Sequence, residues 1–359
     1  MPDPRAQRYA QALALYERND PGAAALFESL LAEDPAHVAA RYKLANLRKE
    51  AGALDAAMAG YTEVLRRDPA HAEAMNNLGA VLQMRGDNAG AENYYRRAIA
   101  TNPGLAAPAA NLGRLLQTLG RIDEAARVFS DALERGLDAG LFGHLLDAAS
   151  GHGSARAPVS YVRETFDAFA AGFEQHLVGE LRYEVPRRLA ALVLGDNEGG
   201  EGRRFDILDL GCGTGLVGDA LGAVAASLVG VDLSPKMLEE ARRKGRYSAL
   251  HEADILEWLV SAPRDRFDLV VAADVFIYIG ELERVFREVA RVLRKAGKFG
   301  FSVETCVDAP WRLLPTGRYA QSDGYVLDLA SRNSLRIGGR VPVEIRGGVP
   351  GMLYFAEKC

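Results

Sequence analysis

Cysteine is scarce in this sequence, and its scarcity excludes two kinds of protein. The 359 residues contain three cysteines, Cys212, Cys306 and Cys359, an odd number that are far apart and lack metal-ligand spacing. We therefore expect neither a disulfide framework nor a zinc site, and we assign no metal ligands. A reducing, cytoplasmic compartment is the environment that fits best.

Long apolar runs and an excess of basic charge are also missing. No stretch of about 18 or more apolar residues occurs, so no transmembrane helix or membrane partner is expected. The first residues, MPDPRAQRYA, lack the apolar centre of a signal peptide. The formal net charge of −5 argues against nucleic acid as a partner. A length of 359 residues is typical of two domains.

A period of 34 residues runs through the first part of the chain. Four classes of residue keep this step: Pro35, Pro69 and Pro103; Gly52, Gly86 and Gly120; Ala23, Ala57, Ala91 and Ala125; Phe27, Tyr61, Tyr95 and Phe129. This period is typical of helix-turn-helix solenoids. Residues from about 4 to 138 resemble tetratricopeptide repeats, with about four copies.

Each repeat predicts two helices. The glycine ends the first helix, the alanine lets the two helices approach, the aromatic residue fills the space between them, and the proline stops the second helix. His37 and His71 also keep the period, and we expect them to start helices. With a closing helix over 137–150, residues 1–150 are predicted to form an all-α tetratricopeptide solenoid.

Two asparagines indicate what the repeats bind. Asn77 and Asn111 lie 34 residues apart, with Lys43 in the same register. In the superhelices that these repeats resemble, this register faces the concave groove, where an amide that both donates and accepts can hold a peptide backbone. A protein or peptide partner is therefore expected on this face. The alternative is that the asparagines make only inter-helix hydrogen bonds and the repeats serve as a scaffold.

The second domain is predicted to be an α/β domain over residues 151–359. The flexible stretch GHGSARAP precedes a helical lead-in over 160–198. Strands are expected at 204–210, 227–233, 247–253, 267–275 and 297–304. They alternate with helices at 217–225, 234–244 and 282–296, the last ended by Gly297, and an antiparallel pair, 341–347 and 351–359, closes the sheet. This alternation predicts a doubly wound, mostly parallel sheet.

A glycine cluster follows the first of these strands. In ILDLGCGTGLVG, the glycines Gly211, Gly213 and Gly215 come at the strand end, where a chain without side chains can turn sharply and let a ligand lie against its backbone. Asp232 ends the next strand, where a carboxylate can accept two hydrogen bonds from ribose hydroxyls. The ligand is therefore expected to contain a nucleoside.

The identity of that nucleoside depends on charge. Residues 213–218 match the loose G-x-G-x-x-G pattern of dinucleotide sites, a weak signal that leaves a nicotinamide oxidoreductase as the runner-up. Asp209, just before the first glycine, would repel a pyrophosphate. It suits a ligand with a positively charged amino group, such as S-adenosylmethionine.

Four motifs in order carry a family resemblance. DLGCGTG, VDLSPKMLEEA, EADI and FDLVVAADVFIY occur between residues 209 and 278. From about residue 160 onward, the chain resembles class I S-adenosylmethionine-dependent methyltransferases. With its fused repeats, it looks like the bacterial members that carry tetratricopeptide repeats, and it is similar to the methyltransferase of the Williams-Beuren region. The resemblance implies a Rossmann-like, seven-stranded domain with S-adenosylmethionine as cofactor.

The resemblance also implies roles at the methionine and ribose end of the cofactor. Asp209 and the loop of Gly211, Gly213 and Gly215 face the methionine part. Asp232 holds the ribose hydroxyls. The alternative for the two carboxylates is a purely structural role in loops or caps.

Four further residues are assigned to the adenine by the same resemblance. Leu233 and Met237 line the ring. Asp254 accepts a hydrogen bond from the adenine amino group, and the backbone N–H of Ile255 meets a ring nitrogen. The alternative for Asp254 is the N-cap of a helix.

A catalytic base is needed only if the acceptor carries a proton that leaves early. The candidates are His176, Tyr161, Asp274 and Tyr278, with Asp274 bordering the substrate side. His176 is equally well explained as a lid histidine that packs. Tyr161 is also a candidate, together with Tyr183, for closing over the cofactor.

Three hypotheses for function follow. The first is a methyltransferase whose repeats bind a protein or peptide substrate or partner. The second is a small-molecule methyltransferase, acting on a carboxylate or phenol, whose repeats serve assembly only. The third, a non-catalytic cofactor-binding protein, is disfavoured by the intact glycine loop. The segment 309–330 is expected to build part of the acceptor pocket, where Arg312, Arg318 and Tyr325 could meet a carboxylate or phosphate. The alternative is that these three are solvated loop residues.

Overall fold

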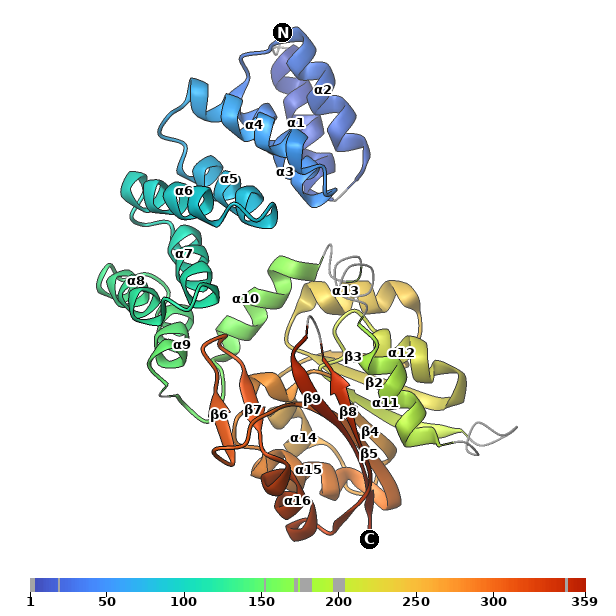
Figure 1. Ribbon diagram of the computed structural model, residues 1–359. Helices are drawn as coiled ribbons and strands as arrows, with labels where there is room; N and C mark the ends of the chain where they lie inside the picture. The colour runs from blue at the N-terminus through green and yellow to red at the C-terminus, as the bar shows by residue number, and fades with distance from the viewer. Residues whose placement is uncertain are drawn as a thin grey trace. The chain divides into compact units, whose positions relative to one another are not determined.

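The computed structural model describes residues 4–18, 20–151, 153–170, 174, 183–195, 204–345 and 348–359. The chain separates into two compact units, Met1–Leu146 and Asp147–Cys359. Figure 1 shows that the first unit consists of helices, whereas the second is built around a sheet. His176 and most of the segment 195–202 lie outside the described residues.

Helices of the first unit follow one another in pairs (Figure 1). The pairs are α1 (Pro4–Glu17) with α2 (Gly22–Glu33), α3 (Val38–Glu50) with α4 (Leu54–Arg67), α5 (Ala72–Met84) with α6 (Asn88–Thr101), and α7 (Ala106–Thr118) with α8 (Ile122–Glu134); α9 (Ala139–Ser150) comes next. The predicted helical solenoid is confirmed.

Glycines and histidines that recur every 34 residues lie at the ends of the helices. Gly52, Gly86 and Gly120 each lie one residue beyond a helix C-cap and have φ of +73°, +84° and +74°, a left-handed conformation that glycine adopts without strain. His37 and His71 are N-caps whose Nδ1 accepts from the N–H of Ala40 and Ala74, at 3.2 and 3.3 Å. Both predictions are confirmed.

In each repeat, an aromatic residue of the second helix fills the space between that helix and the first. Tyr95 and Phe129 are at most 1% exposed. A Cβ added to Gly79 would lie 2.8 Å from Tyr95 Cε1, and one added to Gly113 would lie 2.0 Å from Phe129 Cε1. The first helix therefore carries a glycine where the ring of its partner helix needs room, because close-packed interiors leave no space for an extra methyl group.

A chain of amides links successive repeats. Asn77 Nδ2 donates to Asn46 Oδ1 at 3.0 Å, and Asn46 Oδ1 also accepts from the buried Tyr61 hydroxyl at 2.7 Å. Asn111 Nδ2 donates to Asn76 Oδ1 at 2.9 Å. Asn77 and Asn111 therefore make the inter-helix hydrogen bonds of the alternative explanation. Partner binding on this face stays a prediction.

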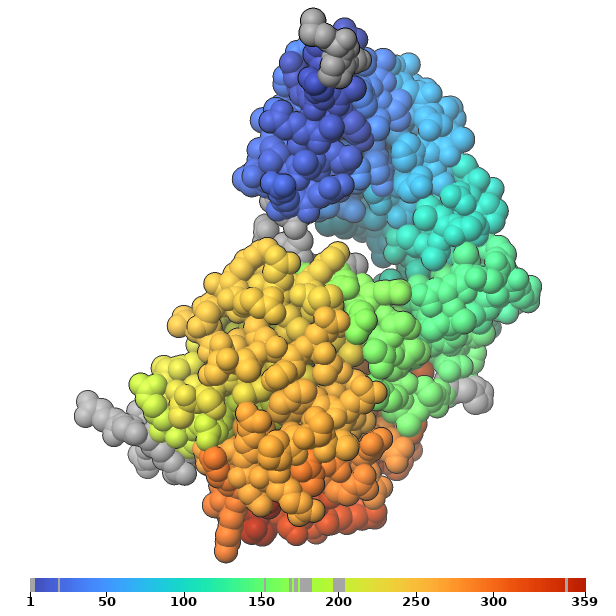
Figure 2. Space-filling model, turned by 180° about the vertical axis from the view of Figure 1, so that it is seen from behind, coloured from blue at the N-terminus to red at the C-terminus, as the bar shows by residue number. Residues whose placement is uncertain are grey.

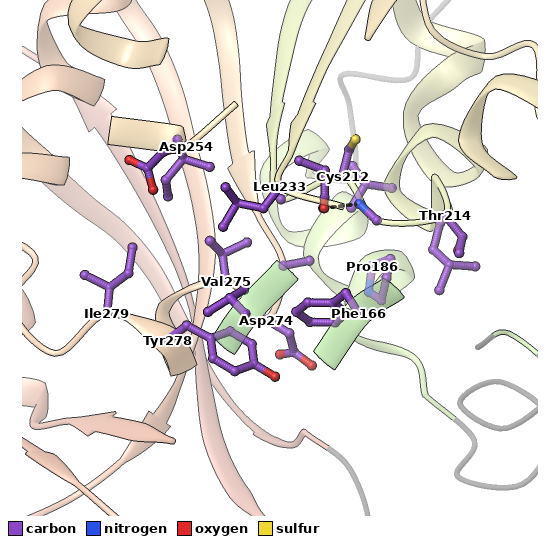
Figure 3. Close-up of a pocket in the computed structure, with 18 of the residues that line it drawn as sticks. Phe166, Pro186, Cys212, Thr214, Leu233, Asp254, Asp274, Val275, Tyr278 and Ile279 are labelled. Carbon is purple, nitrogen blue, oxygen red and sulfur yellow. Dashed lines mark hydrogen bonds between the residues drawn. The ribbon is translucent and has the colours of Figure 1, made fainter. Parts of the chain in front are cut away.

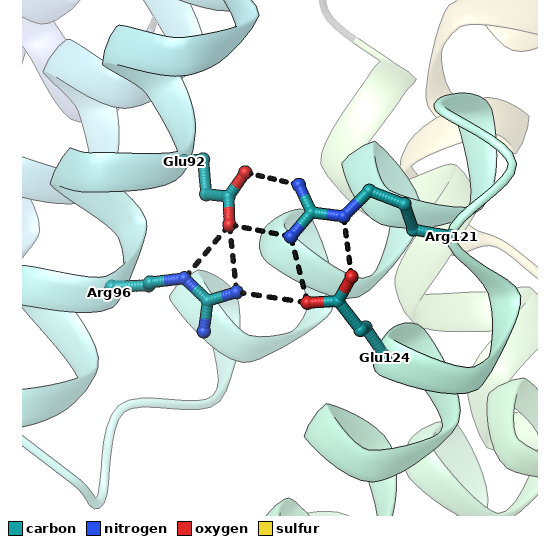
Figure 4. A network of polar contacts seen from close by, with 4 residues as sticks. All are labelled: Glu92, Arg96, Arg121 and Glu124. Atoms are coloured by element: carbon teal, nitrogen blue, oxygen red, sulfur yellow. Dashed lines mark hydrogen bonds and ion pairs between the residues drawn. The ribbon is translucent and has the colours of Figure 1, made fainter.

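A second polar link joins α6 to α8 (Figure 4). Arg121 contacts Glu92 and Glu124 at 2.6 Å each, and Arg96 contacts Glu92 at 2.7 Å. The hydrogen bond from Arg121 lowers the pKa of Glu92. Because ion pairs of exposed side chains contribute little to stability, the packed rings dominate the stability of the repeats.

The sheet of the second unit has parallel strands in its centre. The order β3-β2-β1-β4-β5 is parallel throughout, and β9 runs antiparallel between β5 and β8. Bounds are β1 Phe205–Leu210, β2 Ala225–Asp232, β3 Ala249–Glu252, β4 Phe267–Ala272, β5 Leu293–Thr305, β8 Leu335–Glu344 and β9 Pro350–Lys358. These are the seven expected strands, and the class of fold is confirmed.

Two short strands extend the sheet beyond the seven. The strands β6 (Trp311–Leu313) and β7 (Tyr319–Gln321) form an antiparallel hairpin, and β7 pairs with the end of β5. The described sheet therefore has nine strands. The hairpin comes from the segment that was expected to build the acceptor pocket.

Helices cover both faces of this sheet. One core includes α11 (Val185–Leu194) and α12 (Leu216–Leu221), and the other includes α14 (Ile255–Ser261), α15 (Glu283–Val292) and α16 (Asp323–Arg332). The remaining elements are α10 (Val159–Phe169), α13 (Pro235–Lys244), and the short helices η3 (Gly222–Val224) and η4 (Phe276–Tyr278). From behind, the yellow-to-orange part of the chain, which carries α13 to α15, forms a continuous surface (Figure 2).

The predicted end of one helix is wrong. The helix expected over 282–296 stops at Val292, and Leu293 already belongs to β5, where it is fully buried and pairs with Phe267. Gly297 is therefore a strand residue, and Ala296 takes the left-handed φ of +59°. Pairing with β4 overrides the helical pattern of the sequence at this point.

Replacing Gly113 by alanine tests the packing of the repeats. We expect Gly113→Ala to lower the free energy of unfolding by about 1–3 kcal/mol, because the methyl group overlaps the buried Phe129 ring. Gly143→Ala in α9 is the control, since its Cβ would meet nothing within 4 Å. Denaturant unfolding followed by helical circular dichroism measures both. Equal stability of the two variants would contradict the packing argument.

Candidate active site

The loop after β1 turns in a way that requires glycine. Gly211, Gly213 and Gly215 have φ of +66°, +52° and +91°. A Cβ on Gly211 would lie 2.5 Å from Val275, whereas one on Gly213 would meet nothing within 4 Å. The backbone at Gly213 therefore borders open space, as the approach of a ligand to the main chain requires.

Asp232, at the end of β2, holds this loop in place. Its Oδ2 accepts from the N–H of Gly213 at 2.9 Å and its Oδ1 from the N–H of Ser234 at 2.8 Å. The side chain is 8% exposed. Burial raises the pKa of Asp232, and the backbone hydrogen bonds act in the opposite direction. A carboxylate oxygen can accept more than one hydrogen bond, so capacity for a ligand remains.

Asp209 lies behind the loop rather than in the wall of the pocket. It is fully buried, and its Oδ2 accepts from the Tyr247 hydroxyl at 2.7 Å. Its Oδ1 has no hydrogen-bond partner among the described residues. Burial raises the pKa of Asp209 to about 7; the Tyr247 hydrogen bond opposes this shift, and the nearby Asp232 adds to it.

A pocket opens beside the glycine loop (Figure 3). It holds about 970 Å³ of empty space, part of it open to solvent. Eight of the predicted site residues lie in its wall: Gly211, Gly213, Asp232, Leu233, Asp254, Ile255, Asp274 and Tyr278. The topology therefore brings together residues from the ends of β1, β2 and β4 and from the loop after β3.

The remaining predicted residues are placed differently. Asp209, Gly215, Met237 and Tyr161 are not in the pocket wall, and His176 lies outside the described residues. Met237 is fully buried, and its N–H donates to Ser234 Oγ, the N-cap of α13. Tyr161 packs edge to face against Tyr278, with 6.5 Å between ring centroids. Tyr161 therefore contacts a residue of the pocket wall without lining the pocket itself.

Asp254 combines the two roles that the sequence left open. It lies in the pocket wall, and its Oδ1 caps α14 by accepting from the N–H of Leu256 at 3.0 Å. It also forms an ion pair with Arg156. Arg156 is held against the pocket because it pairs with Ile279 in a β-bridge, and the next residue, Ala157, donates its N–H to Tyr278 O at 2.9 Å.

At the end of β4, Asp274 has an unusual backbone. Its φ is +57°, a left-handed conformation that aspartate and asparagine adopt more readily than other residues with a Cβ. The Ser302 hydroxyl accepts from the Asp274 N–H at 2.8 Å and donates to its Oδ1 at 3.0 Å. The carboxylate is thereby directed to one place. Figure 3 shows it near the rings of Tyr278 and Phe166, away from Asp254.

Several wall residues escaped the sequence analysis. Arg156 lies in the flexible linker and carries no motif, and Phe166 and Pro186 are unmarked members of the helical lead-in. Tyr247, which supports Asp209, also has no local signal. Their contacts join segments far apart in the chain; Arg156 and Asp254, for example, are separated by 98 residues. Tyr183, expected to close over the cofactor, does line the pocket.

The expectation for segment 309–330 is wrong. None of its residues lies in the pocket wall. The Tyr325 hydroxyl instead accepts from the Leu282 N–H at 2.8 Å, Arg318 lies 3.6 Å from Glu304, and Arg312 pairs with Asp308 at 3.3 Å. This segment instead forms the β6–β7 hairpin and most of α16, and the three side chains have the partners just named.

The described ranges contain no cluster of three or more histidine, cysteine, aspartate or glutamate side chains arranged to hold a metal ion. No helix in the same ranges has the length and apolar character needed to cross a membrane.

Family models match both units of the chain. Residues 208–301 match the model described as methyltransferase domain. Residues 21–82 and 82–146 match the tetratricopeptide repeat model. The second unit is therefore a methyltransferase domain. The chain as a whole combines this domain with tetratricopeptide repeats, as the sequence motifs predict.

Curated relatives are similar over the second part of the chain. A malonyl-[acyl-carrier protein] O-methyltransferase of Paenibacillus sp. (strain JDR-2) is 30% identical over 153 residues, 40% of this chain and 55% of that protein. A ubiquinone biosynthesis O-methyltransferase of Bordetella avium (strain 197N) is 26% identical over 186 residues, 48% of this chain and 73% of that protein. The chain thus spans about half the length of the Paenibacillus relative.

Two solved structures are similar to part of the chain at low identity. Magnesium protoporphyrin IX methyltransferase from Synechocystis PCC 6803, with bound SAH, has 15% identity and a TM-score of 0.45 over 56% of this chain and 99% of that chain. The N-methyltransferase NodS from Bradyrhizobium japonicum WM9, in complex with S-adenosyl-L-homocysteine, has 19% identity and a TM-score of 0.45 over 55% of this chain and 98% of that chain. The similarity to the Williams-Beuren region methyltransferase stays a prediction.

Asp209 predicts a pH dependence of stability. Its pKa is about 7 in the folded chain and near 3.8 when unfolded, so between about pH 4 and 7 the folded state binds more protons. Stability should fall as pH rises through this window, by up to about 1.4 kcal/mol per unit. Asp209→Asn removes this contribution. The unfolding free energy of the variant minus that of the wild type should therefore rise from pH 4 to 7. A constant difference would contradict a buried Asp209 carboxyl that titrates in this window.

Proposed function

We propose that the second unit is an S-adenosylmethionine-dependent methyltransferase that acts on an acceptor held in the pocket. The observation that carries the proposal is the shared position of the left-handed glycine loop and Asp232, at the ends of β1 and β2 and on one pocket. The match to the methyltransferase domain model supports it.

The residues present fit this cofactor. Asp232 retains acceptor capacity for the ribose hydroxyls, and Gly213 borders open space for a ligand. Leu233 and Ile255 provide apolar surface for the adenine. Thr214 Oγ1 is buried without a hydrogen-bond partner among the described residues and belongs to the wall, so it offers a polar contact for the methionine part.

The chain itself supplies alignment and exclusion of water. S-adenosylmethionine, when bound, supplies a methyl group already activated by a positively charged sulfur. The wall residues Phe166, Tyr183, Pro186 and Tyr278 shield the reacting end from solvent. Most of the acceleration of such a transfer comes from holding the reacting atoms in line. Asp274 and Tyr278 are the wall residues proposed to meet the acceptor, with Tyr161 packed behind Tyr278.

Asp232→Ala tests cofactor binding directly. We expect the affinity for S-adenosylhomocysteine to fall at least about 100-fold, because a charged acceptor for the ribose and the anchor of Gly213 are both lost. Calorimetric titration measures it, with Asp328→Ala, an exposed carboxylate on α16 paired with Arg332, as control. Tight binding of NADH in place of S-adenosylhomocysteine would favour the nicotinamide oxidoreductase instead.

The acceptor can be sought with labelled cofactor. The protein, or its Asp232→Ala variant, is added with methyl-tritiated S-adenosylmethionine to an extract of the source cells. Label that depends on Asp232 in the small-molecule fraction supports a small acceptor; the printed name of the Bordetella relative, a ubiquinone biosynthesis O-methyltransferase, is consistent with this. Absence of Asp232-dependent label from every fraction would contradict the proposal.

A second candidate function rests on the repeats. Two matches to the tetratricopeptide model cover residues 21–146 and favour a protein or peptide partner, on the face that carries Asn77 and Asn111. In this version, the repeats present a protein substrate to the second unit. Asp232-dependent label in the protein precipitate of the same experiment would support it.

A further inference from the structure

A short strap, residues 153–157, borders the pocket just before α10 begins. Arg156 pairs with Ile279 in an antiparallel β-bridge, and the N–H of Gly280 donates to Ala155 O at 2.8 Å. Ile279 lies in the pocket wall, as does Arg156 itself. These backbone contacts fix the point from which the Arg156 side chain extends.

The β6–β7 hairpin also holds this strap. The Tyr319 hydroxyl donates to Ser154 O at 2.7 Å, and the Ser154 hydroxyl donates to Arg156 O at 2.6 Å. The two segments pack closely, since a Cβ added to Gly153 would lie 2.6 Å from Leu313 Cδ2. The hairpin therefore supports the strap without lining the pocket.

The Arg156 side chain contacts both carboxylate oxygens of Asp254. Its Nη2 donates to Oδ2, and its Nη1 lies 3.5 Å from Oδ1. Oδ1 also accepts from the N–H groups of Leu256 and Glu257, at 3.0 and 3.3 Å. Because a carboxylate oxygen has two lone pairs, Oδ2 keeps one acceptor position among the described contacts. Asp254 is only 6% exposed, so its charge needs a partner such as Arg156.

This ion pair fixes the direction of the remaining acceptor position. Asp254 and Ile279, which Arg156 joins, lie on the same side of the pocket (Figure 3). A planar guanidinium that meets both oxygens holds the plane of a carboxylate, which a single hydrogen bond does not. Alignment matters for a neutral amine donor, because a hydrogen bond weakens steeply as its angle departs from linearity.

We infer that Arg156 positions the Asp254 carboxylate to accept a hydrogen bond from the adenine amino group of S-adenosylmethionine. The inference rests on the proposed methyltransferase function and deepens it, because Arg156 belongs to none of the motifs that identified the cofactor site. Arg156 acts through Asp254. Its removal should therefore weaken cofactor binding only while the Asp254 carboxylate is present.

Arg156→Ala, made in the full chain, provides the first test. We expect the affinity for S-adenosylhomocysteine to fall about 10-fold in a calorimetric titration, since the carboxylate loses its alignment. The affinity for 5′-methylthioadenosine, which keeps the adenine and ribose but lacks the amino acid part, should fall by the same factor. Arg332→Ala is the matched control, an exposed arginine paired with Asp328 outside the pocket wall. Unchanged affinity, or a loss confined to S-adenosylhomocysteine, would overturn the inference.

A double-mutant cycle provides the second test. Asp254→Asn keeps an oxygen to cap α14 and should itself weaken the binding of S-adenosylhomocysteine about 10-fold. Adding Arg156→Ala to this variant should change the affinity by less than about 2-fold, because the group that Arg156 positions is already gone. A combined loss of about 100-fold, the product of two independent effects, would overturn the inference.

The wild type and the melting temperatures separate the remaining explanations. If the wild type neither binds S-adenosylhomocysteine nor transfers label, the proposed function fails. If it does both while Arg156→Ala binds as tightly, only the role of Arg156 is refuted. A lower melting temperature for Arg156→Ala than for Arg332→Ala, with equal losses in the presence and absence of the Asp254 carboxylate, would show that Arg156 only stabilises the strap.

Discussion

Asp209 and Asp232 end neighbouring parallel strands in the interior, and a buried carboxylate must find donors. For Asp232 the donors are two backbone N–H groups, those of Gly213 and Ser234. Gly213 itself has a left-handed φ, which explains the glycine there. The hydrogen bond from Gly213 to Asp232 fixes the loop beside the pocket that both residues line. The free energy of an unpaired buried charge, several kcal/mol, makes this constraint strong.

Local signals made much of the fold predictable. The 34-residue step identified the repeats because each helix end, each buried ring and each facing glycine recurs in one unit. The alternation of strands and helices identified the parallel sheet, and strand ends located the glycine loop and Asp232. The prediction failed at Val292, where the helical pattern continues but Leu293 pairs with β4. Such tertiary pairing cannot be read from a periodic pattern.

The acceptor side was predicted less well, for a related reason. Asp274 was marked by its place after a strand, but Ser302, which directs its carboxylate, lies 28 residues away on the next strand. Arg156 comes from a linker with no pattern at all. Segment 309–330 was expected in the acceptor pocket because Arg312, Arg318 and Tyr325 could meet an anionic group, yet these three side chains find partners elsewhere. Contacts between distant segments decide which charges face a cavity, and composition does not encode them.

Tyr247 has a consequence for how this glycine loop can change over time. A Cβ on Gly215, Gly218 or Gly230 would lie 3.0, 2.8 or 2.9 Å from the Tyr247 ring, whose hydroxyl reaches Asp209. Gly218 depends on Tyr247 alone, whereas Gly230 also faces Leu250 and Cys212, and Gly215 is required by its left-handed φ of +91°. In related chains, a smaller residue at position 247 would release Gly218, so these two sites should vary together, and Asp209 should lose its partner in the same lineages.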